Sequence, residues 1–186
     1  QIPLEAQMKF SIKREELISI LSEYTNILKD NPIKPIVSGL QIKAENNLIT
    51  FVGTNLEVDH IRKVEADVKE EGSLVLKPFL LLEYIKLLDE EYIEFILNNG
   101  FITVHQAEFS ILEEGTFPVI TETTPIKLLA ITGGELVKLL EKSKFAASLT
   151  NDNIQITCVR VIFKLNEINL VSTDSYRLLY MKADKN

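Results

Sequence analysis

The chain alternates between stretches in which hydrophobic residues recur at every second position and stretches in which they recur at every third or fourth. Residues 8–12 follow the first pattern, which predicts a half-buried strand. From Leu17 to Leu28 the spacing is helical and leaves one apolar face, so this stretch predicts an amphipathic helix. Pro32 and Pro35 end it, because proline lacks the amide proton that a helix needs. Strands are predicted next over residues 36–44, 48–54 and 58–68.

The same succession of a strand, a helix and further strands occurs twice more. In the second unit a strand at residues 73–76 precedes a helix marked by Leu81, Tyr84, Ile85 and Leu88. Strands follow over residues 92–97, 100–104 and 108–112, with Asn98-Asn99-Gly100 as a hairpin turn. In the third unit a strand at residues 126–130 precedes a helix marked by Leu136, Leu139 and Leu140, and strands follow over residues 156–164, 168–172 and 178–183.

A constant shift of 119 residues relates the first unit to the third. It matches Ile12 with Ile131, Glu16 with Glu135, Leu17 with Leu136, Leu21 with Leu140, Val52 with Val171, Thr54 with Thr173 and Asn55 with Asp174. Such similarity indicates duplication of a strand–helix–strands unit. Because one unit has too little core to be stable alone, two should join in one domain. We expect a tail or expression remnant at residues 1–7, a first domain at 8–122, and the first half of a second domain at 126–186, where the chain stops in mid-domain.

The composition indicates a globular protein. Of 186 residues, 46% are hydrophobic and 25% are charged, which excludes a disordered chain. The sequence shows neither an uncharged apolar run of about 18 residues nor a signal-peptide pattern, so we expect a cytoplasmic protein with no membrane partner. The net charge of −7 weakens a nucleic-acid role without excluding it, because phosphate contacts are local and are screened beyond about 10 Å.

Candidate catalytic and metal-binding residues are few. His60 and His105 have no cysteine or carboxylate at the spacing of metal ligands, and we expect both on strand surfaces. Cys158, the only cysteine, lies in an apolar stretch and is predicted to be a small core residue. Gly133-Gly134 precede a helix without a phosphate-binding fingerprint, so they predict a helix-start turn. We predict no metal, no cofactor and no catalytic residue.

Five short segments, taken in order along the chain, resemble one family. They are Met8-Lys9-Phe10-Ser11-Ile12-Lys13-Arg14-Glu15-Glu16-Leu17, Gly53-Thr54-Asn55-Leu56-Glu57, Phe117-Pro118, Phe145-Ala146-Ala147-Ser148 and Thr173-Asp174-Ser175-Tyr176-Arg177-Leu178. The ordered set resembles the bacterial sliding clamps, the beta subunit of DNA polymerase III, over residues 8–183. The chain departs from the family at Asn31 and Gln155, where arginine is common, and at Ser175-Tyr176, where Gly-His is common.

The resemblance implies an α+β fold, the DNA-clamp fold. Its repeated strand–helix–strands units place their helices on one face, the interior of a ring, and their antiparallel sheets outside. It also implies a non-catalytic processivity factor that encircles duplex DNA without sequence preference and tethers the replicative polymerase, although family members are often classed with DNA-directed DNA polymerase. The clamp loader and repair factors are further expected partners, bound through short hydrophobic peptide motifs. The full-length protein should be a homodimer.

Three surfaces follow from the same resemblance. The DNA-facing candidates are Lys13, Arg14, Lys29, Lys34, Lys86, Lys138, Lys142 and Lys144. The dimer seam maps to Leu80, Phe109 and Ile111. One wall of a peptide-binding groove maps to Gln155, Thr173, Ser175, Tyr176, Arg177 and Leu178. Taken residue by residue, the lysines fit solvated helix faces equally well, and Leu178 fits ordinary core with Asp174 and Arg177 as a turn and its ion pair.

Two other functions remain open at this point. One is a protein-interaction module with no role on DNA. The other is an enzyme whose catalytic residues lie beyond Asn186. The sequence that follows would separate them, because a clamp should continue with three more strand–helix–strands units.

Overall fold

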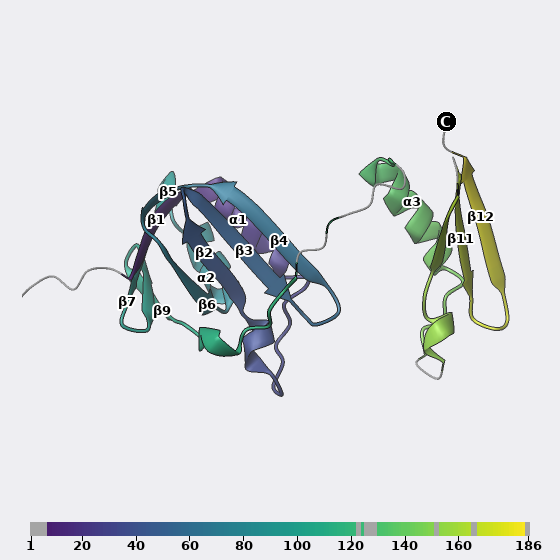
Figure 1. Cartoon of the computed structure of the whole chain (residues 1–186), viewed down its shortest axis with the longest axis horizontal. Coiled ribbons are helices and arrows are strands. Elements are labelled where there is room, and N and C mark those ends of the chain that lie inside the picture. The colour runs from purple at the N-terminus through teal and green to yellow at the C-terminus, as the bar shows by residue number, and fades with distance from the viewer. Residues whose placement is uncertain (1–6, 122–123, 125–129, 151–152, 165–166, 185–186) are drawn as a thin grey trace, which may run out of the picture. The chain divides into compact units, whose positions relative to one another are not determined.

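A computed structural model describes residues 7–121, 124, 130–150, 153–164 and 167–184. The chain divides into two compact units, Gln1–Thr121 and Glu122–Asn186 (Figure 1). Both combine antiparallel strands with helices, so the predicted α+β class is confirmed. Within the described ranges, no helix is long and apolar enough to span a membrane.

The first unit consists of two halves, each with a first strand, an α-helix and then further strands. The first half contains β1 (Met8–Lys13), α1 (Arg14–Tyr24), the 3₁₀ helix η1 (Pro35–Ser38), β2 (Leu40–Glu45), β3 (Leu48–Thr54), β4 (Asp59–Glu65) and β5 (Asp67–Glu70). The second half contains β6 (Gly72–Leu76), α2 (Pro78–Lys86), β7 (Tyr92–Asn98), β8 (Phe101–Val104), β9 (Ala107–Ser110) and the 3₁₀ helix η2 (Glu114–Thr116). The first two predicted strand–helix–strands units are therefore present.

The two halves exchange their first strands. One sheet has the order β4-β3-β2-β6 and the other the order β5-β1-β7-β8-β9. Thus β6 from the second half extends the sheet of the first half, and β1 from the first half extends the sheet of the second, each by antiparallel pairing. This reciprocal exchange gives the unit an approximate twofold symmetry.

The two helices pack against each other and share one core with both sheets (Figure 1). Arg14 at the start of α1 donates hydrogen bonds to the carbonyls of Ile85 and Lys86 at the end of α2, at 3.1 and 3.0 Å. The helices therefore run in opposite directions. Across the core, the rings of Phe10 and Phe95 stack with their centroids 4.6 Å apart, which adds a specific aromatic contact to the burial of both side chains.

The prediction of a single strand over residues 58–68 is wrong. The chain leaves the first sheet after β4 and joins the second as β5, and at the corner the Ala66 amide donates to the Asn47 carbonyl at 3.0 Å. Val64, Ala66 and Val68 all pack on the same core. Because their period-two spacing continues through the corner, the hydrophobic pattern contains no sign of the break.

The second unit repeats the first half of the first unit. It contains α3 (Gly133–Lys144), the 3₁₀ helix η3 (Ile154–Ile156), β10 (Arg160–Lys164), β11 (Glu167–Thr173) and β12 (Leu178–Asp184), with the sheet order β10-β11-β12. The shift of 119 carries β3 onto β11 and β4 onto β12, and it carries every strand pair of the first unit's β2, β3 and β4 onto a pair here. The predicted strand at residues 126–130 lies outside the described residues.

Two segments of this unit differ in detail from the sequence-based predictions. The strand predicted from residue 156 begins only at Arg160, because residues 154–156 form η3. Cys158 is consequently exposed rather than in the core, and its thiol donates to the Ile154 carbonyl at 3.4 Å. The glycine pair does begin a helix, but the N-cap is Thr132, whose side chain forms a capping box with Glu135.

The contact between helix and sheet differs between the two repeats. In the first unit Tyr24 lies against Gly53 and donates its hydroxyl proton to the Phe51 carbonyl at 2.8 Å. Burial raises the pKa of the Tyr24 hydroxyl. The equivalent positions in the second unit are Ser143 and Ser172, and the Ser172 hydroxyl donates to the Ser143 carbonyl. The pair of a tyrosine and a glycine in the first unit is thus replaced by a pair of serines in the second.

Gly53→Ala should therefore destabilise the first unit. A Cβ at this position would lie 2.6 Å from the Tyr24 ring, and overpacking of a buried site costs roughly 1–3 kcal/mol. Urea unfolding followed by circular dichroism measures the change. Gly115→Ala, where a Cβ meets nothing within 4 Å, is the matched control and should stay within roughly 0.5 kcal/mol of the parent chain. Equal midpoints for the two variants would contradict the proposed contact.

Candidate functional site

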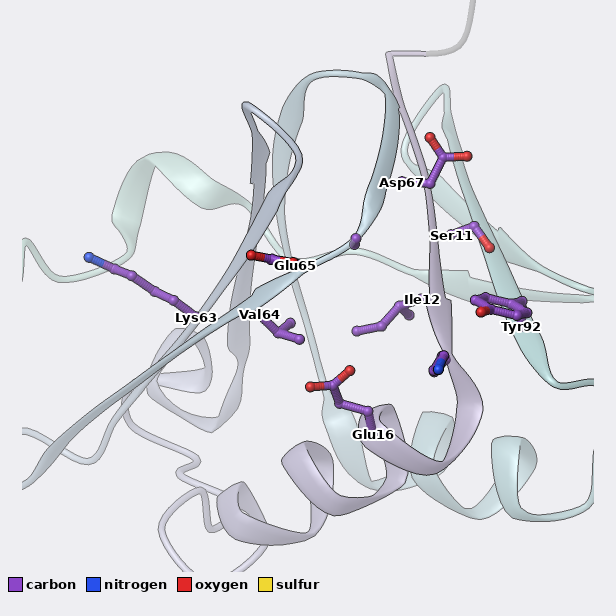
Figure 2. Close-up of a pocket in the computed structure, with 10 residues that line it drawn as sticks. Ser11, Ile12, Glu16, Lys63, Val64, Glu65, Asp67 and Tyr92 are labelled. Atoms are coloured by element: carbon purple, nitrogen blue, oxygen red, sulfur yellow. The ribbon is translucent and has the colours of Figure 1, made fainter.

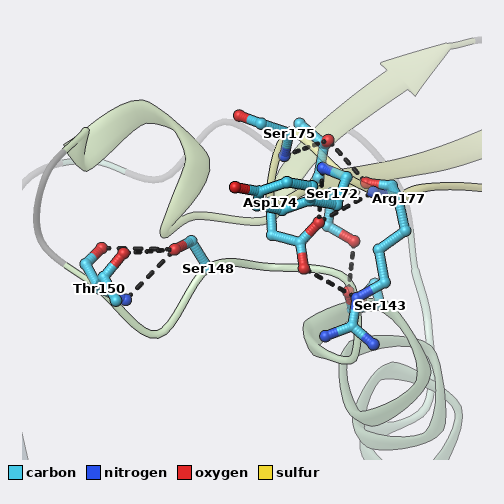
Figure 3. Close-up of polar contacts among 9 residues, drawn as sticks. Ser143, Ser148, Thr150, Ser172, Asp174, Ser175 and Arg177 are labelled. Atoms are coloured by element: carbon cyan, nitrogen blue, oxygen red, sulfur yellow. Dashed lines mark hydrogen bonds and ion pairs between the residues drawn. The ribbon is translucent and has the colours of Figure 1, made fainter.

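The turn between β11 and β12 is held by side chains from its own first two residues (Figure 3). The Thr173 hydroxyl donates to the Arg177 carbonyl at 2.7 Å and accepts from the Ser175 amide at 3.1 Å. One carboxylate oxygen of Asp174 accepts from the amides of Tyr176 and Arg177, at 3.0 and 2.9 Å. Ser175 has a φ of 76°, so the turn holds a non-glycine residue in the left-handed region.

The first unit contains the same turn between β3 and β4. The Thr54 hydroxyl accepts from the Leu56 amide at 2.9 Å, and the side-chain oxygen of Asn55 accepts from the amides of Glu57 and Val58. Leu56 has a φ of 72°. Because the bonds recur at positions shifted by 119, threonine and Asn or Asp serve to fold the turn in both units.

Arg177 distinguishes the second turn from the first. Its Nε lies 2.8 Å from the second carboxylate oxygen of Asp174, and its guanidinium carbon lies 4.5 Å from the centroid of the Phe145 ring. The backbone amide of Arg177, then that of Tyr176 and the guanidinium, lower the pKa of Asp174. Arg177 is therefore held within the turn by an ion pair, and it links the turn to the end of α3 by a cation–π contact.

Most residues predicted for the peptide groove gather on this turn. Tyr176 is 98% exposed and Leu178 is 68% exposed, so Leu178 does not belong to the core of the described unit. Thr173 is partly buried by its turn bonds, while Ser175 and Arg177 are exposed. The remaining predicted residue, Gln155, is exposed in η3, where its amide donates to the Asn153 side chain at 3.0 Å.

Phe145 is a surface residue of this site that the sequence analysis did not assign to it. It is exposed beside Arg177. The shift of 119 places Asn26 and Val58 at the equivalent positions of the first unit. Both members of the contact thus change together between the repeats, and a comparison of the repeats at every position could have detected the pair.

The candidate DNA-facing cations differ in what they contact. Arg14 and Lys86 are engaged within the first unit, Arg14 with the carbonyls of α2 and Lys86 with Glu83 at 2.8 Å. The others are exposed: Lys13, Lys29 and Lys34 in the first unit, and Lys138, Lys142 and Lys144 on α3. Since α1 also carries Glu15, Glu16 and Glu23, α3 has the most cationic surface of the three α-helices described.

The residues predicted for the seam lie at one edge of the first unit. β9 is the last strand of its sheet, so one side of its backbone has no strand partner among the described residues. Leu80 on α2 is 67% exposed. Phe109 and Ile111 are half-buried against the core, and the Phe109 ring lies 5.7 Å from that of Tyr84. An exposed sheet edge with apolar neighbours is typical of a protein interface.

The two histidines each contact a carboxylate. His60 lies on β4, as predicted, with its Nε2 2.8 Å from Glu23. His105 lies in the turn after β8 rather than on a strand, with a φ of 53°, and its Nε2 is 3.4 Å from Glu90. The described residues contain no group of three or more His, Cys, Asp or Glu side chains that could hold a metal ion.

A pocket of about 490 Å³ opens beside the start of α1 and the corner between β4 and β5. Figure 2 shows Ile12 and Val64 between Glu16 of α1 and the strand residues Glu65 and Asp67. Lys13, Lys63, Ser11, Ala66 and Tyr92 complete the lining. No histidine or cysteine lines the pocket.

Comparison with known proteins gives a consistent result. The profile of the family described as "DNA polymerase III beta subunit, N-terminal domain" matches residues 8–126. A beta sliding clamp of Micrococcus luteus is 26% identical over 175 residues, which cover 92% of this chain and 56% of that protein. A beta sliding clamp of Vibrio harveyi is 32% identical over 146 residues, which cover 75% of this chain and 100% of that sequence.

The fold agrees with the sequence match. A solved DNA polymerase sliding clamp from Bacillus subtilis superposes with a TM-score of 0.87 at 22% identity, covering 96% of this chain and 50% of that one. The chain therefore spans about half the length of the Micrococcus protein and of the solved Bacillus chain.

Substitutions of Asp174 should separate its hydrogen bonds to the turn amides from its ion pair with Arg177. Asp174→Asn keeps a side-chain acceptor for the turn, as Asn55 does in the first unit, but loses the ion pair with Arg177. Because folding lowers the pKa of Asp174, its charge stabilises the fold above the ordinary pKa of 3.8, and this contribution disappears as the pH falls below that value. The parent chain should melt above the variant near neutral pH and converge with it in acid.

Thermal unfolding by circular dichroism from roughly pH 2 to pH 7 measures this difference. Asp174→Ala, which also loses the turn bonds, should melt lower than the parent at every pH. A constant gap between the parent and Asp174→Asn across this range would show that the ion pair does not stabilise the fold.

Proposed function

The chain belongs to the DNA polymerase III beta subunit family, and on this premise we propose that it acts as part of a DNA sliding clamp. Such a clamp is a non-catalytic processivity factor that encircles duplex DNA without sequence preference and tethers the replicative polymerase in the cytoplasm. The observation that carries the proposal is the duplicated unit, in which two halves with exchanged strands form one domain and a third begins again after 119 residues. We propose that the second unit is the first half of a second clamp domain.

The surface chemistry supports contact with DNA that is weak and local. The exposed lysines of α3 give one helix a cationic face, although the whole chain carries a net charge of −7. A closed ring needs little affinity to remain on DNA, since dissociation requires opening of the ring or a DNA end. Few phosphate contacts then suffice, and each weakens as salt increases.

The edge of the first unit supports assembly into a ring. We propose that β9 with Phe109 and Ile111, together with the exposed Leu80 of α2, forms the seam with another subunit in a full-length homodimer. An edge strand offers a row of amide and carbonyl groups for pairing with another strand. Its apolar neighbours add surface whose exposure to water is unfavourable. Because Leu80 is far more exposed than Ile111, it is the better position at which to disrupt the seam without disturbing the core.

Retention on circular DNA tests the topological mechanism. A longer protein that carries this chain together with the remaining family length should stay on nicked circular DNA through gel filtration after loading. Cutting the circle should release it, because a free end allows the ring to slide off. Leu80→Glu should lose retention on circles, whereas Leu149→Glu, a fully exposed position outside the proposed seam, should keep it. Equal retention on linear and circular DNA would contradict encirclement.

The turn after β11 supports a docking site for partner peptides. We propose that Tyr176, Arg177 and Leu178, with Phe145 beside them, form one wall of a groove for hydrophobic peptide motifs of the polymerase, the clamp loader and repair factors. Thr173, Ser175 and Gln155 would border it. Leu178 offers apolar area, and the Arg177 guanidinium, held between Asp174 and Phe145, offers a flat face and hydrogen-bond donors.

Leu178→Ala should weaken binding of such a peptide to the longer protein by about 1–3 kcal/mol, because a buried leucine anchor contact contributes that much. Titration calorimetry with a short peptide carrying two or three large apolar residues measures it. Leu149→Ala, which removes an equally large side chain from a 99% exposed position, is the matched control. Equal affinities of the parent and Leu178→Ala, with unchanged melting, would remove this turn from the site.

A further inference from the structure

The first helices of the two repeats carry charges of opposite sign. Arg14 with Glu15, Glu16 and Glu23 gives α1 a net charge of −2. Three lysines and two glutamates give α3, its equivalent in the second unit, a net charge of +1. The repeats thus conserve the fold of the helix and its sheet while the charge of the helix changes.

The difference is located outside the apolar face of each helix. The shift of 119 matches three such positions: Glu15 with Gly134, Ser19 with Lys138, and Glu23 with Lys142. In each α-helix the second and third of these positions are four residues apart, so their side chains lie on the same side of the helix. At all three positions the second unit has the less negative or the more positive residue.

The exposure of these positions does not depend on the second half of a domain. In the first unit, where both halves are present, Leu17 and Leu21 are fully buried while Glu15 and Ser19 are exposed. Covering the equivalent leucines of α3 would therefore leave Lys138, the equivalent of Ser19, in contact with solvent. The lysine is a surface residue of a complete domain as well as of the described unit.

The lysines of α3 also differ from the helix cations of the first unit in their contacts. Among the described residues, neither Lys138 nor Lys142 forms an ion pair or a side-chain hydrogen bond, whereas Arg14 donates to the carbonyls of α2. On α1 the Glu23 carboxylate lies 2.8 Å from the His60 ring nitrogen. The clearest contrast is therefore between the exposed Glu15 with its neighbour Ser19 and the free lysines of α3.

On the basis of the proposed clamp function, in which the helices line the hole, we propose that the two repeats act oppositely on DNA. Lys138 and Lys142 contact phosphates, and the acidic side of α1 with Glu15 repels them. Each phosphate that a protein neutralises adds to its affinity for DNA. The charge of α1 therefore limits the number of phosphate contacts, which keeps the ring weakly held and free to slide.

Exchanging residues between the repeats tests this division. Fluorescence anisotropy of a short linear duplex measures the affinity of the 186-residue chain for DNA over a range of salt concentrations. Lys138→Ser, which copies the first repeat, should reduce the slope of log K against log salt by about 0.9 and weaken binding roughly tenfold at about 50 mM salt. The double variant Glu15→Gln/Ser19→Lys, which gives α1 the charges of α3, should change both quantities by similar amounts in the opposite direction.

A control variant separates local charge from net charge. Glu45→Lys also adds two positive charges, but Glu45 is exposed on β2 and faces away from the core, since the neighbouring Ala44 is buried. It should change the affinity less than twofold, because a charge beyond about 10 Å is screened. No binding by the parent chain at the lowest salt, equal slopes for the parent and Lys138→Ser, or an equal gain for Glu45→Lys and the double variant would each overturn the proposal.

Linear DNA makes this test independent of the clamp function. Binding to a duplex with free ends requires no closed ring, so a failure of retention on circular DNA would leave these results unaffected.

Lysine acetylation of the unmodified chain gives a readout that requires no substitution. Duplex DNA should slow the reaction of Lys138 and Lys142 with acetic anhydride, measured by mass spectrometry of peptides. Lys43, which is exposed on β2, should react at an unchanged rate. Equal protection of Lys43 and the α3 lysines, or protection of neither, would contradict phosphate contact through α3.

Discussion

The architecture of the first unit depends on the reciprocal exchange of first strands. β1 lies in the sheet of the second half, and β6 lies in the sheet of the first. Neither sheet is complete without the other half, so the two helices are brought together and one core forms beneath both sheets. The hydrogen bonds of Arg14 to the end of α2 stabilise the same arrangement, since they satisfy carbonyl groups that a helix leaves without partners.

This constraint also explains which surfaces are available for function. Arg14 donates to carbonyls of α2, and Lys86 pairs with Glu83, so these two cations of the first unit's helices are engaged within the unit. The lysines of α3 are exposed, and among the described residues no second α-helix packs beside α3. At the turn, the side chains of Thr173 and Asp174 form hydrogen bonds with backbone groups. The side chains of Tyr176 and Leu178, which follow them, are exposed.

The sequence predicted the duplication well because burial in both repeats imposes the same spacing. The shift of 119 matches whole strands and their pairing, and it locates the start of α3. It could not show the corner at Ala66, where the alternation continues while the chain changes sheets. It also misplaced Cys158, since an apolar stretch is equally compatible with a 3₁₀ helix followed by an exposed bend. The engagement of Arg14 depends on residues 71 positions away, which no local pattern contains.

The pairing of Met8 with Leu97 has a consequence for how the protein folds during synthesis. β1 is made before its partner β7, which follows only after α1, the strands β2 to β6 and α2. Until then Phe10 has no Phe95 to stack on, and closing so long a loop slows the step that completes the core. Nascent chains should therefore pass through an interval in which apolar strands are exposed and vulnerable to aggregation or chaperone capture. The hairpins β10–β11 and β11–β12, which join neighbouring segments, form without that delay.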